Sequence, residues 1–301
     1  AQQRLLHEVQ LPLLRAFAAE LRTRASSATL LSDEAVGEWG ALGALLQTIF
    51  FCAQLLSEWQ ETDPLLDFAP DMLQSRVTGS EQAEAVSCLP GGTAMAAGVF
   101  TPVLRALDSI ASELEEHAIE RVGANFSSGC RRYFHERRDL RFLPLLTSVV
   151  ELDVSPALSE PLSQLRTELV ALQAVAPPAS MRRVWQRIAA DADSLFAEQL
   201  LRHVQLSPGG AVQLCRDLRA VIESFARFSS RPATSLRRLH ESCQLLELSA
   251  AERSRMLRLM ATPAEHSVDG STAQRKALTD LGIHVISAAE GRDFLSRMHN
   301  D

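Results

Sequence analysis

Residues 100–122 read FTPVLRALDSIASELEEHAIERV, and helical periodicity is clearest in this stretch. Its apolar residues recur at intervals of three and four, which is the spacing of one helix face. They are Phe100, Val103, Leu104, Leu107, Ile110, Ala111, Leu114, Ala118 and Val122. Pro102 is compatible with a helix because it falls in the first turn, where its missing amide is not needed. The stretch predicts one long helix, and we expect a shorter, separate helix from about Ser127 to Leu140.

The same period recurs along most of the chain. Near its beginning, an apolar helix face is formed by Leu5, Leu6, Val9, Leu13, Phe17 and Leu21. Strand-forming residues are sparse and aromatic residues make up only 5%, whereas the strong helix formers Leu, Ala, Arg, Gln and Glu dominate. No repeat of fixed period is visible, so a solenoid is not expected. The pattern predicts an all-α protein, in which antiparallel helices form an elongated stack of small bundles.

Residues 61–98 interrupt this pattern. Proline, glycine and small polar residues replace the apolar stripe there, which is typical of a long connection between helices. We therefore predict a mobile segment near 61–98 within a first helical domain, residues 1–150. A second helical bundle is expected over residues 151–301.

Composition narrows the classes of function. The net charge of −7 disfavours nucleic acid as a main partner, because duplex-binding domains are usually basic. The five cysteines are odd in number and widely spaced, which predicts free thiols in a reducing compartment. The longest apolar run, from about Ala41 to Leu56, contains Gln47 and Gln54 and is shorter than the roughly 20 residues of a membrane span. With no signal peptide visible, we expect a soluble or peripheral protein.

Motifs of catalysis, cofactor binding and metal binding are incomplete. The chain has no GxxxxGK[ST] sequence. His135-Glu136 begins like HExxH, but Asp139 stands where the second histidine would be. His240-Glu241 fails in the same way, with Gln244 at that position. We therefore expect a non-enzymatic protein without a cofactor or a metal.

One local cluster of basic residues is a candidate partner-binding surface. Its candidate residues are Arg131, Arg132, His135 and Arg138, in a stretch that also contains Arg137 and Arg141. On a helix this basic collar could meet an acidic partner segment or anionic lipid. The alternative is an ordinary solvated helix face, with Tyr133 and Phe134 turned into the core.

Ordered blocks in the last 120 or so residues resemble a known family. Residues 208–217, PGGAVQLCRD, are similar to the Gly-Gly-Ala-x-Gln-Leu-x-x-Asp stretch of RINT/TIP proteins. Arg231-Pro232 and residues 239–248, LHESCQLLEL, follow in the family's order, and residues 277–283, ALTDLGI, resemble its closing helix. Independently of any family, Gly209-Gly210 is interpreted as a helix–helix turn, with a glycine capping the preceding helix.

The resemblance implies a CATCHR-type helical rod. It implies a subunit of a multisubunit vesicle tether in Golgi-to-ER retrograde transport, which binds ER SNAREs, other tether subunits and possibly a vesicle coat. The expected location is the cytosol and the cytoplasmic face of the endoplasmic reticulum membrane, with peripheral attachment through partners. Two alternatives stay open: a Golgi tether similar to the fourth subunit of the conserved oligomeric Golgi complex, and a generic helical scaffold outside membrane traffic.

Overall fold

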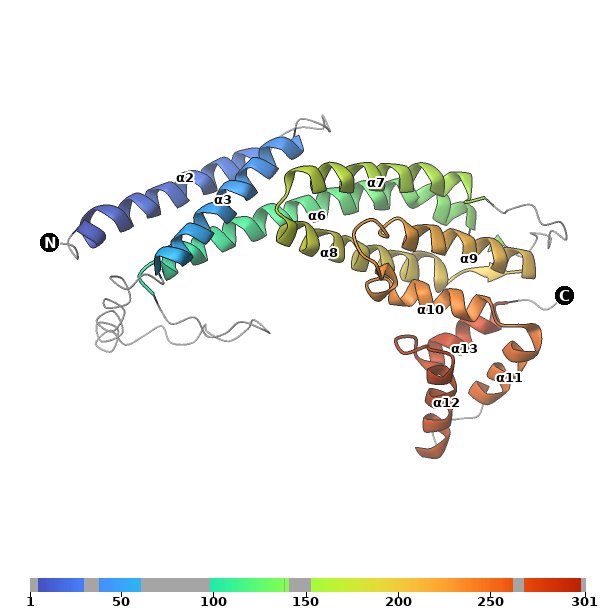
Figure 1. Ribbon diagram of the computed structural model, residues 1–301. Coiled ribbons are helices and arrows are strands. Elements are labelled where there is room, and N and C mark those ends of the chain that lie inside the picture. The colour runs from blue at the N-terminus through green and yellow to red at the C-terminus, as the bar shows by residue number, and fades with distance from the viewer. Residues whose placement is uncertain are drawn as a thin grey trace. The chain divides into compact units, whose positions relative to one another are not determined.

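The computed structural model describes residues 5–29, 38–60, 98–137, 139–140, 153–261 and 268–298. These residues are almost entirely helical, as predicted (Figure 1). The elements in the first half are η1 (Leu6–Gln10), α2 (Leu11–Thr29), α3 (Glu38–Gln60), α6 (Thr101–Arg137) and β1 (Asp139–Leu140). They are followed by α7 (Pro156–Val175), α8 (Pro178–Phe196), η2 (Ala197–Leu201), β2 (Gln205–Leu206), α9 (Pro208–Glu223) and η3 (Pro232–Thr234). The last are α10 (Arg237–Leu246), α11 (Ala250–Ala261), α12 (Val268–Asp280) and α13 (Ala288–Ser296).

The chain forms two compact units. Unit 1 consists of Ala1–His117 and Ala171–Met181, and unit 2 consists of Ala118–Val170 and Arg182–Asp301. The division passes through α6, α7 and α8, because each of these helices contributes residues to both units. The two folding domains expected on either side of residue 150 stay a prediction. The segment expected to be mobile, 61–98, lies outside the described residues except for Gly98.

Helix α3 forms much of the core of unit 1. Its buried side chains are Trp39, Leu42, Leu46, Ile49 and Leu56. Gln47 donates from its amide to the carbonyl of Val175 at 2.8 Å, and a Cβ on Gly43 would lie 2.4 Å from the Cβ of Val175. By length and hydropathy alone, residues 39–60 could cross a membrane, and only 28% of the most apolar window is buried in the fold. The buried face and the close contact with Val175 give α3 the packing of a bundle helix.

Only part of the apolar face predicted for η1 and α2 is buried. Leu6 and Leu21 are buried as predicted, and so are Leu11, Ala18 and Ala25. Leu13 is 64% exposed, however, and Leu5, Val9 and Phe17 are exposed as well. The five-residue π-helix η1 precedes α2 and departs from the regular helical spacing on which the prediction relied.

Helix α6 is one uninterrupted helix of 37 residues rather than the two helices that we expected. Ser127, Ser128 and Gly129 continue the helix, because none of them removes a backbone donor as proline would. The predicted apolar face is confirmed, since Phe100, Val103, Leu107, Ile110, Leu114 and Val122 are all buried.

Aromatic side chains connect α6 and α8 within unit 2. The ring of Phe196 lies 6.2 Å from that of Phe126, 5.9 Å from that of Tyr133 and 5.0 Å from that of Phe134, measured between centroids. Edge-on and offset arrangements at such distances are favourable for aromatic pairs. Trp185 of α8 and Phe225, just after α9, are also buried.

The C-terminal part of unit 2 contains short helices with well-defined ends. Two capping boxes are present, at Ser249 with Glu252 and at Ser287 with Glu290. Helix α12 ends at Asp280, and Gly282, two residues further on, has a φ of 78°. The amide of Ile283 donates to the carbonyl of Leu278 at 2.9 Å, and the amide of Gly282 donates to that of Thr279 at 2.9 Å. This is a Schellman motif, and it explains the Leu-Gly-Ile sequence.

The paired glycines have a different role from the one that we expected. They do not cap the end of a preceding helix; they lie in the first turn of α9, where Ser207 is the N-cap and accepts from the amide of Gly210 at 3.1 Å. A Cβ on Gly210 would lie 2.5 Å from the carbonyl oxygen of Leu140, in the short parallel pair formed by β1 and β2. Gly210 is therefore required by the close approach of the β1 backbone to α9.

Candidate functional site

A buried polar network explains the polar residues of the glycine-containing block. Asp217 of α9 has no exposed surface and accepts four hydrogen bonds. Tyr133 donates to it at 3.0 Å, the Ser155 amide and hydroxyl donate at 2.9 and 2.6 Å, and Gln213 donates at 3.1 Å. Burial and then the nearby Asp217 carboxyl raise the pKa of Tyr133 well above its ordinary value. The network connects α6, the start of α7 and α9, so its role is to hold the fold together.

Two other buried acids connect segments in the same way. Glu241 of α10 accepts from the amides of His284 at 2.8 Å, Val285 at 2.9 Å and Ile286 at 2.8 Å. Asp193 of α8 accepts from the amides of Leu239 at 3.0 Å and Arg238 at 3.3 Å. These amides lie in the first turn of α10, whose own N-cap residue provides no side-chain acceptor. Sequence patterns alone do not reveal these partners, because each bond joins residues more than 40 positions apart.

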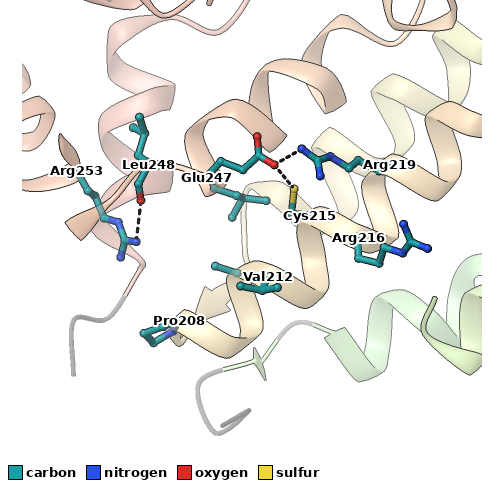
Figure 2. Close-up of a pocket in the computed structure, with 10 residues that line it drawn as sticks. Pro208, Val212, Cys215, Arg216, Arg219, Glu247, Leu248 and Arg253 are labelled. Atoms are coloured by element: carbon teal, nitrogen blue, oxygen red, sulfur yellow. Dashed lines mark hydrogen bonds and ion pairs between the residues drawn. The ribbon is translucent and has the colours of Figure 1, made fainter. Parts of the chain in front are cut away.

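An open groove lies on the other side of α9. It has a volume of about 610 Å³ and is shown in Figure 2. One wall is a stripe along α9, formed by Pro208, Ala211, Val212, Cys215, Arg216 and Arg219. The opposite wall is formed by Leu246, Glu247 and Leu248 at the end of α10, together with Arg253 of α11. The stripe is apolar at its N-terminal end and basic at its C-terminal end.

The polar side chains of the groove are partly engaged with one another. Glu247 pairs with the guanidinium of Arg219 and accepts from the Cys215 thiol at 3.6 Å (Figure 2). Arg253 is 7% exposed and donates to the carbonyl of Leu248 at 3.4 Å, and burial lowers its pKa. Arg216 is exposed, and Figure 2 shows its guanidinium turned away from Glu247. Of the three arginines that line the groove, Arg219 is the one that pairs with Glu247.

The two thiols next to the groove affect each other. Cys243 of α10 donates to the carbonyl oxygen of Cys215 at 3.8 Å. The neighbouring thiol of Cys243 lowers the pKa of Cys215, and the neighbouring thiol of Cys215, together with burial, raises the pKa of Cys243. Both thiols are free, as are Cys52 and Cys130, whereas Cys88 lies outside the described residues. Across the described ranges, His, Cys, Asp and Glu form no group of three that could hold a metal ion.

The structure describes three of the four candidate residues of the basic collar. Arg131, Arg132 and His135 are exposed on α6, and Arg138 lies outside the described residues. Tyr133 and Phe134 are buried between them. Arg132 pairs with Glu136 at 2.7 Å, and both line a hollow of about 520 Å³ that also contains Glu160. Two carboxylates therefore offset the positive charge on this side, and partner binding by the collar stays a prediction.

Comparisons with known proteins agree with the resemblance of the sequence blocks. The RINT-1/TIP-1 family matches residues 1–298. A search of curated protein sequences finds no match. Among solved structures, the chain is similar to one in the crystal structure of the SNARE Sec20 bound to the Dsl1 complex subunit Tip20, with a TM-score of 0.63 and 14% sequence identity. The similarity covers 98% of this chain and 48% of that chain, so the chain spans about half the length of its structural relative.

These findings establish the class and the family of the protein. The described residues form an all-α fold of packed helices, similar to the fold of the matching chain in that crystal structure. The chain belongs to the RINT-1/TIP-1 family.

Proposed function

We propose that this chain is part of a vesicle-tether subunit that acts in Golgi-to-ER retrograde transport. Its work is adhesive and non-enzymatic: it binds ER SNAREs and other tether subunits through helical surfaces. The proposed location is the cytosol and the cytoplasmic face of the endoplasmic reticulum, with peripheral attachment through these partners. The observation that carries the proposal is the match of the RINT-1/TIP-1 family to residues 1–298.

The structural relative supports the choice of partner. That structure contains Tip20 of the Dsl1 complex together with the SNARE Sec20. SNARE segments and tether subunits are themselves helical, and an amphipathic helix binds by placing its apolar face in a groove. Each such contact is modest in affinity, and a multisubunit complex gains strength because several contacts form together.

The proposal is tested by affinity capture of the tagged full-length protein from cells, followed by mass spectrometry. We expect recovery of tether subunits and ER SNAREs. Depletion should also impair retrieval of ER-resident cargo, measured as its escape to later compartments.

Two results would contradict the proposal. If no tether subunit or SNARE is recovered and cargo retrieval is normal after depletion, the assignment to the ER tether fails. If subunits of the conserved oligomeric Golgi complex are recovered instead, the Golgi tether becomes the better assignment.

A further inference from the structure

We infer that the groove beside α9 binds a peptide segment of a partner protein in which Asp or Glu residues flank large apolar side chains. The inference rests on the proposed function, since it names the kind of partner segment that the adhesive role requires. It is carried by the shape of the groove, by an exposed apolar residue within it and by its charge.

The apolar part of the groove is open to a ligand. Val212 is 46% exposed, whereas Leu214 and Leu218 on the opposite side of the same helix have no exposed surface. Pro208 and Ala211 adjoin Val212 on the stripe, and Leu246 and Leu248 lie on the opposite wall. A volume of about 610 Å³ falls within the range of about 300–1,000 Å³ that is usual for ligand pockets. The groove can therefore take up apolar side chains without rearrangement.

The basic part of the groove favours carboxylates. Among the residues that line the groove are Arg216, Arg219 and Arg253 and one acid, Glu247, although the chain as a whole carries a net charge of −7. Arginine binds carboxylates through two parallel hydrogen bonds, and such bonds are stronger where water is partly excluded. Glu247 pairs with Arg219, so the exposed Arg216 is the groove residue best placed to receive a carboxylate from a ligand.

Charge and shape together select a peptide over other anions. The net charge of −7 disfavours the closely spaced phosphates of a nucleic acid. A groove with walls on α9 and α10 is concave, whereas a bilayer surface requires a flat or convex face. Apolar residues and arginines that line one groove match a segment that carries both apolar and acidic side chains.

The test uses the full 301-residue chain as bait for a library of random 12-residue peptides displayed on phage. We expect enriched peptides to combine Asp or Glu with Leu, Ile, Phe or Trp. The best peptide is then synthesised, and its Kd is measured by fluorescence anisotropy for wild-type protein and for three variants, each first shown by circular dichroism to be folded.

Val212→Asp and Arg216→Glu change exposed residues of the groove, and each should weaken binding at least about tenfold, because an apolar contact is lost or a like charge is introduced. Arg255→Glu is the matched control, since Arg255 is exposed on α11 and does not line the groove. Its Kd should equal that of the wild type. Binding should also weaken as salt is raised.

Several outcomes would overturn the inference. They are no enrichment, enrichment of neutral or basic peptides, or equal affinity of wild type, Val212→Asp and Arg216→Glu. Binding of the wild type to phosphatidylserine vesicles that is lost in Arg216→Glu would identify a membrane as the occupant and would also overturn it. The proposed function is separable: if wild type and Arg216→Glu recover tether subunits equally from cells, the tether role stands and the groove inference fails.

Discussion

At the scale of single residues, unit 2 contains three buried acids that have the same structural role: Asp193, Asp217 and Glu241. Each accepts hydrogen bonds from donors that are distant in the sequence, so each connects two or more segments of unit 2. A buried carboxyl group without partners would destabilise the fold. A buried carboxyl group that accepts hydrogen bonds fixes the positions of its donors, because loss of the carboxyl group or of a donor leaves unpaired polar atoms in the core. The buried acids of the family-like blocks, Asp217 and Glu241, are thus structural.

Replacing residues of the Asp217 network should destabilise the fold in a definite order. Tyr133→Phe removes one of four donors and should lower the free energy of unfolding by about 1–3 kcal/mol, as expected for a bond to a buried acid. Asp217→Ala should cost more, since Tyr133, Ser155 and Gln213 all lose their acceptor. Urea denaturation measures both. Ser109→Ala, at an exposed hydrogen bond, is the control and should change stability by less than about 0.5 kcal/mol. A Tyr133→Phe variant as stable as the wild type would contradict this role.

Asp193 should make stability depend on pH. Burial raises its pKa above the ordinary 3.8, although the amides of Leu239 and Arg238 oppose this. The folded state then binds the proton more tightly than the unfolded state, so protonation favours folding. The contribution of Asp193 to stability should therefore decline as the pH rises from 3.8 through the raised pKa. Asp193→Asn does not titrate, so the stability of the wild type minus that of the variant should fall over this window. Parallel stability curves would refute the effect.

At the scale of elements, β1 lies close to α9, and we therefore expect alanine substitution of two helical glycines to have opposite effects on stability. Gly210→Ala should destabilise the fold by about 1–3 kcal/mol, because the new Cβ would overlap the Leu140 backbone. Gly123→Ala in α6 is the matched control, since a Cβ there meets nothing within 4 Å. It should stabilise the fold by about 0.5–1 kcal/mol through helix propensity. Thermal melting compares the two, and the same sign for both would show that β1 does not constrain α9.

The sequence predicts helices well where the period is unbroken. The predicted apolar face of α6 is confirmed because its inward residues follow the regular spacing. The same spacing places the buried residues of α7, which are Leu158, Leu162, Leu165, Leu169 and Leu172. The prediction fails where local geometry departs from that spacing, as at η1, which turns Leu13 and Phe17 outward. Helix ends also depend on contacts with segments that are distant in the sequence. Gly209-Gly210 indicates a turn from the sequence alone, whereas in the structure both glycines lie in the first turn of α9, where β1 approaches closely.

At the scale of the whole molecule, the family could be inferred from ordered blocks but the candidate site could not. The blocks mark what holds unit 2 together: Gly210 against Leu140, the Asp217 and Glu241 contacts, and the Gly282 cap. The groove brings α9 together with residues 246–253, and nothing in the sequence indicates that Val212 is exposed there. The basic collar, in contrast, is visible in the sequence, and its role stays a prediction.

The Glu241 contacts have a consequence for the time scale on which unit 2 opens. The amides of His284, Val285 and Ile286 lie outside any helix or strand, where exchange with deuterium is normally fast. Since a buried carboxyl group holds them, they should exchange as slowly as helical amides of α10, and only when this part of the unit unfolds. Exchange followed by mass spectrometry or NMR measures this, with the amide of Arg231, bonded to an exposed serine, as the fast control. Glu241→Ala should release the three amides to rapid exchange, and fast exchange in the wild type would mean that the turn opens independently of α10.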